Sequence, residues 1–358
     1  MKLLDRQSLF KTEALAPLVT TLSQFQVQLA SGWNAAQTVR LPRAPRSRRI
    51  VVCGMGGSNL ASEIARDILG PESPFGWDLI RDYTIPNAVT KADLVILSSY
   101  SGTTEEVLAC YEAARARRLP MVVIATGGEL VDRAKKQRVP LVLLDAGTNP
   151  SIQPRYGVAL QLGALLGMVA RWQRSLINQQ ELKETISYLE VLARDVYGPQ
   201  VLTADNPAKY AAQLLVNRLP IVMAAEGLSG VAHTFANQIN ESAKVLAHHH
   251  LLSELNHHLL EGLQLPVASH NQLMALFLTS DQYSRRIQQR IKVTQSVLEK
   301  QHIPYLEVSI DGKSPLAVAL EGLLFASWAS LYLALLLEQN PTDIPWVKYF
   351  KKELGKKS

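Results

Sequence analysis

The chain has 358 residues, of which 47% are apolar and 19% charged, so it can bury a sizeable core and is predicted to hold two globular domains. Its 37 basic and 31 acidic residues give a net charge of +6, but the basic residues are dispersed, which argues against a nucleic-acid partner and suits a small anion. Two lone cysteines, Cys53 and Cys110, lie in core-like patterns, which predicts no disulfide and a cytoplasmic location.

Residues 1–45 have an amphipathic, helical pattern and end in the Pro/Arg-rich stretch LPRAPRSRR. Charged residues interrupt the first ten positions, so a continuous apolar h-region is missing and no signal peptide is expected. We therefore predict an N-terminal helical segment that precedes the first domain.

Residues 46–175 alternate short apolar runs with helical patterns. The runs RIVVCG, DLVILSS, PMVVIATGG and PLVLLDAG are typical of buried strands, and WDLIRDY is a weaker strand candidate. Alternating strands and helices form βαβ units, so this region is predicted to be a doubly wound parallel sheet with helices on both faces. A long helix is expected near residues 156–173.

A polar stretch reaches to about residue 206, and the alternation then returns within residues 176–358. LPIVMAAEG, LMALFLTSD and PYLEVSID resemble strands, which predicts a second α/β domain of similar size. The apolar run 315–337 is long enough to cross a membrane, but it contains Glu321 and many Gly, Ser and Ala residues. Because no other run looks membranous, a buried central helix is favoured and no membrane partner is expected.

The first candidate loop for binding an anion is CGMGGSNLASEI, in which Gly57 and Ser58 precede a predicted helix. Glycines allow a ligand to approach the backbone, and the first amides of a helix attract anions. A dinucleotide site would need the spacing G-x-G-x-x-G, but Asn59 follows the glycines without a further glycine. A P-loop would need G-K-[ST], which the sequence lacks here.

The second candidate loop is LSSYSGTTEEVL at residues 97–108, between a predicted strand and a predicted helix. Ser99, Ser101 and Thr104 can converge with backbone amides on the three oxygens of a phosphate group. The alternative is an ordinary helix N-cap made by Ser101 or Thr103.

Taken together, GMGGS and SYSGTTEE resemble the sugar isomerase (SIS) domain, whose serine/threonine loop holds the phosphate of a sugar phosphate. Further motifs narrow the resemblance to the bifunctional phosphoglucose/phosphomannose isomerases, and these are IQPRYG, QINESAK, SELNHH and the C-terminal NPTDIPWVKYFKKEL. The similarity runs from about residue 50 to the C-terminus. It implies two SIS-type, flavodoxin-like, three-layer αβα subdomains, and an enzyme that uses neither a metal nor another cofactor.

An aldose–ketose isomerase moves a proton between C1 and C2 through an enediolate, so it needs a base, a charge stabiliser and a group that opens the sugar ring. The resemblance implies that Glu241 is the base and that Arg155 stabilises the enediolate. It also implies that His257 assists ring opening and reaches into the partner's site across a homodimer. The phosphate of glucose 6-phosphate, mannose 6-phosphate or fructose 6-phosphate would be held by Gly57, Ser58, Ser99, Ser101 and Thr104.

The family also uses a lysine on the last helix. The apolar face of that predicted helix is formed by Ile344, Val347, Phe350 and Leu354. Lys351 lies within this face, whereas Lys348 is at its margin and Lys352 outside it. A lysine on a core face needs a partner or a function, so Lys351 is the candidate, and the alternative is a lysine that snorkels from a frayed terminus.

Histidines cluster at residues 248–250 and 257–258, beside Glu254 and Glu261, which raises the alternative of a metal site. Such carboxylate-bridged sites repeat an i, i+3 pair on separate helices, and only one segment offers it here, so no metal is expected. The family usually has asparagine where His258 stands, which leaves the ring-opening geometry and the specificity open.

Two other functions stay open from the sequence. The same scaffold could act on another phosphosugar, as an amino-sugar enzyme or a deglycase does. From a different class, an SIS domain can be a non-catalytic phosphosugar sensor that regulates transcription. A sensor would carry a helix-turn-helix module, and residues 1–45 show no basic recognition helix.

Overall fold

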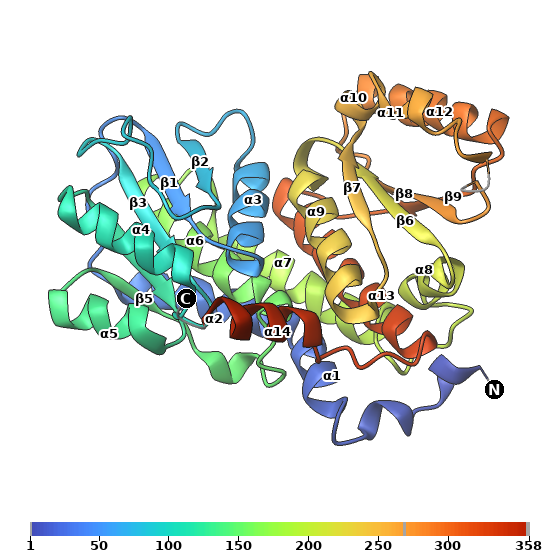
Figure 1. Cartoon of the computed structure of the whole chain (residues 1–358), viewed down its shortest axis with the longest axis horizontal. Helices are drawn as coiled ribbons and strands as arrows, with labels where there is room; N and C mark the ends of the chain where they lie inside the picture. The colour runs from blue at the N-terminus through green and yellow to red at the C-terminus, as the bar shows by residue number, and fades with distance from the viewer. Residues whose placement is uncertain (1, 268–269, 356–358) are drawn as a thin grey trace.

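The computed structural model describes residues 2–267 and 270–355, which form two parallel sheets with helices packed between them (Figure 1). The first sheet has five strands in the order β2-β1-β3-β4-β5. Its strands are β1 (Arg49–Cys53), β2 (Gly76–Ile80), β3 (Leu94–Ser98), β4 (Met121–Ala125) and β5 (Leu141–Leu143). Alternate residues of β1 and β3 enter cores on opposite faces of the sheet, which explains their unbroken apolar sequences.

The second sheet has four parallel strands in the order β7-β6-β8-β9. They are β6 (Leu219–Ala224), β7 (His248–Leu251), β8 (Leu273–Thr279) and β9 (Tyr305–Ser309). The prediction of two doubly wound α/β units is confirmed, and the first sheet has the flavodoxin-like strand order. Strand β7 was not predicted from the sequence. It is a half-exposed edge strand, in which His248 pairs with Ile221 and His250 with Met223.

Helices connect the strands and cover the sheets. Those that precede or belong to the first sheet are α1 (Ala16–Ser23), α2 (Phe25–Thr38), α3 (Gly57–Leu69), α4 (Glu105–Ala116), α5 (Gly128–Gln137) and α6 (Val158–Trp172). Those that follow are α7 (Gln179–Val191), α8 (Pro207–Leu215), α9 (Ser229–Gln238), α10 (Leu252–Leu255), α11 (Leu259–Gly262), α12 (Arg285–Lys300), α13 (Pro315–Leu336) and α14 (Pro345–Leu354). Helix α7 lies within the stretch up to residue 206, which was predicted only to be polar. Leu182 and Leu189 form a buried stripe on this helix, and this stripe packs it against the core.

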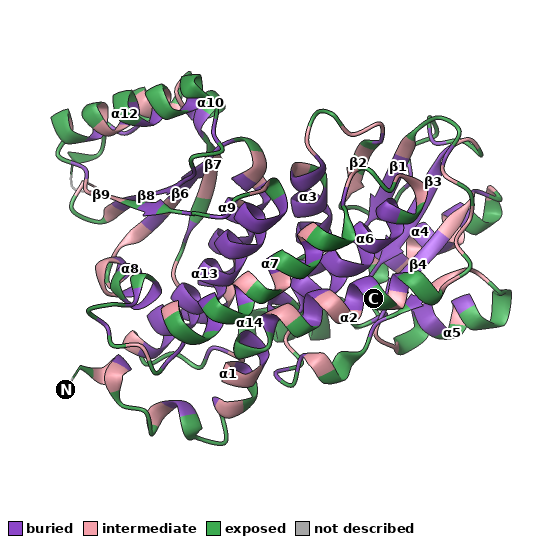
Figure 2. Cartoon of the chain, turned by 180° about the vertical axis from the view of Figure 1, so that it is seen from behind, coloured by how far each residue is buried: buried purple, intermediate pink, exposed green. Residues whose placement is uncertain are grey.

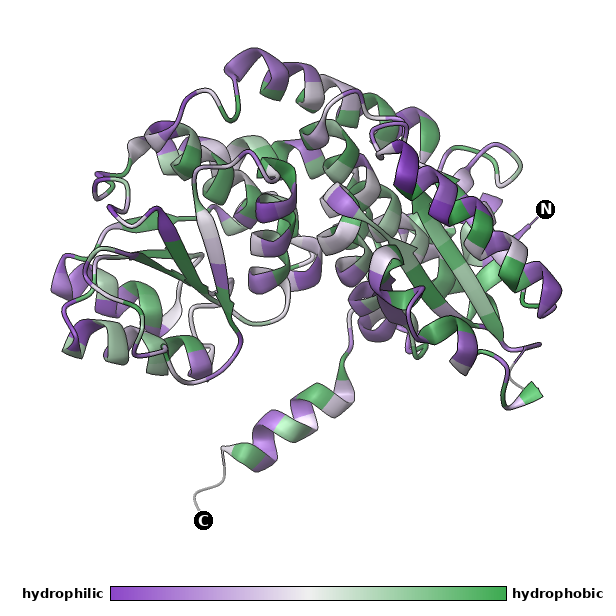
Figure 3. Cartoon of the chain, turned by 90° about the horizontal axis from the view of Figure 1, so that it is seen from above, coloured by the Kyte–Doolittle hydropathy of each residue, from purple (hydrophilic) through white to green (hydrophobic). Residues whose placement is uncertain are grey.

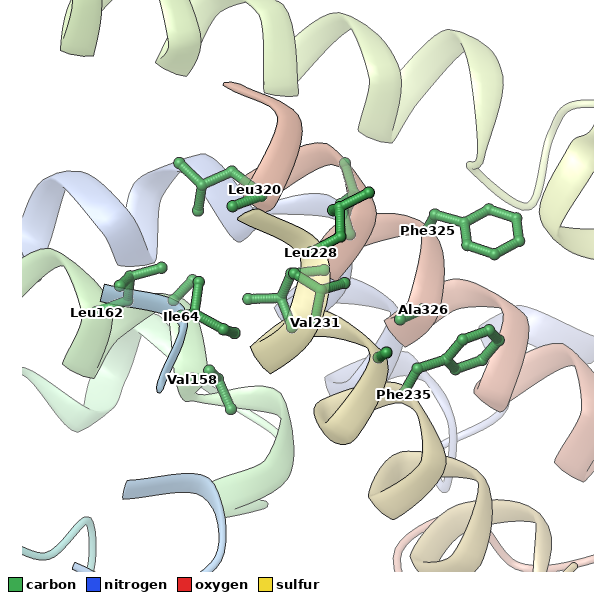
Figure 4. Packing of buried hydrophobic residues seen from close by; sticks show 14 of the residues in the cluster. Ile64, Val158, Leu162, Leu228, Val231, Phe235, Leu320, Phe325 and Ala326 are labelled. Atoms are coloured by element: carbon green, nitrogen blue, oxygen red, sulfur yellow. The ribbon is translucent and has the colours of Figure 1, made fainter. Parts of the chain in front are cut away.

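The largest core lies between the two sheets, where α3 and α6 of the first unit meet α9 and α13 of the second (Figure 4). Ile64 and Leu162 face Val231 across this seam. Within the described residues, α13 is long and apolar enough to cross a membrane by length and composition alone, and its apolar window is entirely buried (Figure 2). Its residues therefore contact protein on all sides, as the central-helix interpretation expects.

The N-terminal segment is joined closely to the first unit, since α2 packs along α6. A Cβ at Gly32 would overlap the carbonyl oxygen of Leu160, and one at Gly163 would overlap that of Leu29. The two backbones can approach this closely because neither position carries a side chain. The predicted boundaries at 45/46 and 175/176 stay predictions, because α2, α7 and α13 pack against elements on both sides of them.

Helix α14 differs from the other long helices because none of its residues is buried. It projects from the body of the chain (Figure 3), and its apolar side chains are exposed, with Trp346 at 81% and Phe350 at 62%. The amphipathic face predicted for this helix therefore exists, but the expectation that Lys351 faces a core is wrong within this single chain, since nothing in the described residues covers that face.

Candidate active site

The second predicted loop follows β3 and places its hydroxyls in two pairs. The buried Ser99 Oγ lies 2.8 Å from Thr104 Oγ1 and accepts the Gly102 N–H at 3.0 Å. The exposed Ser101 Oγ lies 3.0 Å from Thr103 Oγ1. Thr104 is the residue before α4, but its side chain makes no capping bond. The hydroxyls therefore make hydrogen bonds within the loop, and the alternative of an ordinary helix N-cap is not observed.

The loop is held by close backbone packing against the turn before α5. Gly102 has a φ of +69°, and a Cβ there would overlap the carbonyl oxygen of Gly127. Thr126 donates both its N–H, at 3.0 Å, and its hydroxyl, at 2.6 Å, to the Tyr100 carbonyl. The positions of Ser99 and Ser101 are thus fixed by backbone contacts on both sides of the loop.

The first predicted loop joins this hydroxyl loop at Ser58, near the start of α3. Ser58 is buried, and its Oγ accepts the Tyr100 N–H at 3.0 Å. Gly57 lies against the turn that contains Pro154, since a Cβ at Gly57 would be 2.9 Å from the Pro154 carbonyl oxygen. Both residues belong to the first turn of α3, the end of the helix that carries a partial positive charge.

Arg155 lies at the centre of the predicted site and is only 2% exposed. Its Nε donates to Ser242 Oγ at 3.1 Å, and its Nη1 donates to Gln153 Oε1 at 3.1 Å and to Glu241 Oε2 at 3.3 Å. Its Nη2 donates to the Pro341 carbonyl. These partners fix the position and orientation of the guanidinium group. Its positive charge is permanent, so it cannot take up a proton.

Glu241 lies in a π-helical turn, Ile239–Ala243, which continues α9. Such turns are frequent at functional sites. Its neighbour Asn240 closes the turn onto the start of β7, donating to the Ala247 carbonyl at 2.9 Å and accepting the Ala247 N–H at 3.0 Å. The Glu241 side chain is 35% exposed, so it is fixed by Arg155 and still accessible to a ligand.

The structure does not bring His257 to Glu241 within one chain. Glu241 precedes β7 and α10 follows it, so the two residues lie beyond opposite ends of that strand, which is about 13 Å long (Figure 1). His257 is exposed, next to the end of α10. The predicted histidine and the predicted base therefore do not share one site within a single chain.

The candidate lysines on α14 are likewise apart from Arg155. Lys351 and Lys352 are exposed. Lys348 Nζ is 2.5 Å from Asp343 Oδ1 and belongs to an exposed ion pair. None of the three has a hydrogen bond to Glu241 or Arg155 in the part of the chain that the structure describes. The role predicted for Lys351 stays a prediction that requires α14 to be packed differently.

The histidine run at residues 248–250 forms most of the edge strand β7. His249 stacks on His233 of α9 with ring centroids 4.2 Å apart, and His250 lies 6.4 Å from His258. Among the described residues, no group of three or more His, Cys, Asp or Glu side chains is placed to hold a metal ion.

His233 also joins the two sheets across the seam. Its Nδ1 lies 2.8 Å from the buried Glu63 Oε2 of α3, and Arg81 pairs with the other oxygen of that carboxylate. Burial and then the charge of Arg81 lower the pKa of His233 to about 4. Burial, followed by the neighbouring His233, likewise lowers the pKa of His249 to about 4. Because Arg81 compensates Glu63, the neutral imidazole is the form that the seam favours.

Sequence reasoning missed two residues that build this site. Asn149 is fully buried and donates to the Tyr100 hydroxyl at 2.8 Å and to the Gln153 carbonyl at 3.1 Å, which ties the hydroxyl loop to the Arg155 turn. Lys244 lies three residues after Glu241 and donates to that residue's carbonyl. Its place at the end of QINESAK was the available signal, but its role depends on a backbone shape that the sequence does not reveal.

Comparison with known proteins gives a consistent result. The family described as "Bacterial phospho-glucose isomerase C-terminal SIS domain" matches residues 204–354. The chain is 29% identical over 310 residues to the bifunctional phosphoglucose/phosphomannose isomerase of Caldicellulosiruptor bescii, covering 86% of this chain and 89% of that protein. It is 28% identical over 310 residues to the protein of that name from Aquifex aeolicus, with 86% and 90% covered.

A solved structure shares the fold over the whole length. The glucose-6-phosphate isomerase like protein from Thermus thermophilus superposes with a TM-score of 0.61 at 17% identity, covering 98% of this chain and 99% of that one. At this identity the likeness concerns the fold alone, and it agrees with the two parallel sheets described above.

Proposed function

We propose that this chain, which is similar over most of its length to the bifunctional phosphoglucose/phosphomannose isomerases, is an SIS-domain sugar isomerase of that family. It would interconvert glucose 6-phosphate and mannose 6-phosphate with fructose 6-phosphate. The observation that carries the proposal is the contact between Glu241 and the buried Arg155 beside the hydroxyl loop. It combines a carboxylate base, a fixed cation and an anion-binding loop in one place.

In the proposed mechanism the phosphate binds at the two loops that meet at Tyr100. Hydroxyl groups and amide N–H groups are good partners for phosphate oxygens, and the start of α3 adds its dipole. The phosphate would be held by Gly57, Ser58, Ser99, Ser101 and Thr104. Binding here fixes the sugar by its far end, so that C1 and C2 extend toward Arg155.

The proposed base is Glu241. It takes the proton from C2 of the open-chain aldose, and a double bond forms between C1 and C2 as the negative charge moves to the oxygen of C1. A proton then passes from the oxygen of C2 to that of C1, and Glu241 returns its proton to C1 to give the ketose. Negative charge develops on the oxygens of C1 and C2, where the guanidinium of Arg155 stabilises it. The two aldoses are epimers at C2, so their C2 hydrogens lie on opposite faces of the chain. A rotation about the C2–C3 bond brings either hydrogen to the same carboxylate, and its removal makes C2 planar in both cases. One base can therefore serve both substrates.

Ring opening is assigned to His257 of a second copy of the chain. The support is geometric, since His257 and Glu241 lie beyond opposite ends of β7 in one chain. The proposed assembly is a homodimer, and mixing tests it. A dimer that combines Glu241→Gln in one chain with His257→Ala in the other contains one intact site. Activity should return when the two inactive variants are unfolded and refolded together, and no recovery would refute the shared site.

Lys351 is proposed to reach the same site when α14 is packed against the assembled enzyme. The exposed apolar side chains of Trp346 and Phe350 favour such packing, because burying them is stabilising. Lys351→Ala should then reduce turnover more than Lys352→Ala, which alters a neighbouring lysine outside the apolar face of the same helix. Equal effects of the two variants would contradict this assignment.

The activity test uses purified protein with EDTA, glucose 6-phosphate and, separately, mannose 6-phosphate. Formation of fructose 6-phosphate from both is expected, and Glu241→Gln should lower kcat by about 10³-fold. Glu226→Gln is the matched control, because Glu226 is another glutamate of the second unit, and its carboxylate contacts Ser284 and not Arg155. Loss of turnover on chelation would contradict the metal-free mechanism.

Hydrogen exchange at C2 in D₂O separates this enzyme from a non-catalytic sensor. A sensor would bind the phosphosugar and raise the unfolding temperature without exchanging the C2 hydrogen. An enzyme for another phosphosugar would leave both test substrates unchanged and turn over an amino-sugar phosphate. The proposed location is the cytoplasm, which agrees with two free, buried thiols.

A further inference from the structure

Lys244 adopts an unusual backbone conformation directly after the turn that carries Glu241. Its φ of 59° and ψ of 28° lie in the left-handed region. Helices that end in this conformation usually have glycine or asparagine at this position, because a longer side chain is disfavoured there. Non-glycine residues held in this region cluster at active sites. Eight other non-glycine residues of the described chain also have a positive φ, so the contacts of the Lys244 side chain, and not its backbone alone, decide what it does.

The ammonium group of Lys244 connects two segments that are about a hundred residues apart. Its Nζ donates to the carbonyl of Glu241 at 2.5 Å on one side. On the other side it donates to the carbonyls of Asp343 at 2.6 Å and Asn340 at 3.1 Å. An ammonium has three N–H donors, and these acceptors use all of them. Lys244 is therefore a cross-link and is not free to donate a proton to a substrate.

The second segment is a closed turn, residues 340–343. Asn340 Oδ1 accepts the N–H of Thr342 at 2.9 Å and its hydroxyl at 2.8 Å. Arg155 donates to the Pro341 carbonyl of the same turn. The two cations beside Glu241 thus hold one turn between them, and this turn leads into α14.

We infer that Lys244 is a positioning residue, which fixes the Glu241 turn and the 340–343 turn relative to Arg155. The inference rests on the proposed role of Glu241 as the base. Without the ammonium, the Glu241 carbonyl and the 340–343 turn lose their common partner. The carboxylate can then turn away from C2, and Arg155 loses the support of Pro341. Substrate would still bind by its phosphate, because the hydrogen bonds of the Lys244 ammonium within the described residues do not involve the hydroxyl loop.

The test compares Lys244→Gly, Lys244→Met and Lys244→Arg. Glycine suits the left-handed backbone, so this variant should fold at least as well as the natural chain. We expect kcat to fall about 10²-fold in both the glycine and methionine variants, since a displacement of about 1 Å has that effect, while KM stays unchanged. Arginine retains the charge and donors and should restore part of the activity. A fully active glycine variant would overturn the inference.

A second readout does not depend on the activity. Hydrogen exchange at Thr342 and Asp343, and tryptic cleavage within α14, should both become faster in the glycine and methionine variants. If the natural chain turns over neither sugar but these changes appear, the proposed function fails and the cross-link stands. If exchange and cleavage match the natural chain in all variants, Lys244 does not hold the turn and the inference is wrong.

Discussion

The two sheets end in comparable places that are built very differently. In each sheet, the first strand along the chain lies between the second and the third, so the connections leave it toward opposite sides. Such a change of direction leaves a crevice at the carboxyl ends of the strands. At the ends of β1 and β3 this crevice is lined by Ser58, Ser99 and Thr104, with Gly102 allowing close packing. Small side chains and backbone amides leave room there for an anion.

At the ends of β6 and β8 the chain fills the crevice itself. Glu226 has a φ of +46°, and its carboxylate accepts the hydroxyl of Ser284 at 2.8 Å and the N–H of Ser284 at 3.1 Å, just before α12. Tyr283 is buried, and its hydroxyl accepts the Ala225 N–H at 3.0 Å. The Ser284 hydroxyl and the N–H groups of Ser284 and Ala225 at this end of the second sheet therefore already have partners.

The comparison shows that a shared topology fixes where a ligand can bind, but the side chains at the strand ends decide whether it does. The second unit instead places Glu241 just after the end of α9, where its carboxylate pairs with Arg155 of the first unit. In the proposed mechanism, one unit thus binds the phosphate and the other provides the base. Four experiments test this division.

The largest effect is expected for Gly102→Ala. The added Cβ would overlap the Gly127 carbonyl, and the φ of +69° is unfavourable for alanine, so the hydroxyl loop must move. A shift of about 1 Å should lower kcat/KM by about 10²-fold. The exposed Gly262, where a Cβ meets nothing within 4 Å, is the control position. Full activity of Gly102→Ala would show that the loop is not the phosphate site.

Ser99→Ala and Ser280→Ala form a matched pair, because each serine is the first residue after its strand. A hydrogen bond to a charged phosphate contributes about 1.5–3 kcal/mol, so Ser99→Ala should raise KM by about 10- to 100-fold. Ser280→Ala should leave KM unchanged. Similar KM values in the two variants would remove the distinction between the crevices.

The seam between the units should weaken in acid. The pKa values of His233 and His249 are lowered to about 4, so between pH 6.5 and 4 the unfolded chain binds more protons than the folded one. The free energy of unfolding should therefore fall as the pH drops through this window, and stay constant above it. Allowing for the partial exposure of the rings, we expect about 2 kcal/mol between pH 7 and pH 5.

Denaturant titrations at several pH values measure this slope. His233→Gln should reduce the slope by about half, because one of the two seam histidines no longer titrates. The exposed His302 serves as the control, with His302→Asn suited to its φ of 58°. A slope that His233→Gln leaves unchanged would show that the seam does not carry the acid sensitivity.

The smallest effect is expected for Glu226→Gln. The exposed carboxylate loses its charge beside the start of α12 but keeps one acceptor for Ser284, so the free energy of unfolding should fall by about 0.5–1 kcal/mol. Turnover of both sugars should be unchanged, which a thermal melt and an isomerase assay would check together. A clear loss of turnover would mean that the second crevice takes part in the reaction.

Much of the fold was predictable from apolar runs, because strands buried on both faces leave an unambiguous signal. The edge strand β7 was not, since its sequence HHHL is polar and its pairing with β6 depends on tertiary packing. Helix α7 was hidden for a similar reason, as its buried stripe around Leu182 and Leu189 is narrow. In α14 the amphipathic pattern was correct, but a pattern does not identify the partner that covers it.

The site was predictable in composition and less so in geometry. The contact between Arg155 and Glu241 joins residues 86 positions apart, and motifs at those positions were enough to pair them. The separation of His257 from Glu241 follows from β7, which the sequence did not reveal. The role of Lys244 depends on a left-handed backbone at a lysine, which propensities disfavour.

The close approach of α2 and α6 also bears on how the chain is made. Gly32 and Gly163 allow backbone contact between helices that are more than a hundred residues apart, and the first sheet lies between them in the sequence. During synthesis, α2 must therefore wait until α6 has emerged from the ribosome before it is buried. Its apolar face is exposed for that interval, so chaperones that bind nascent chains would find their first target in this helix.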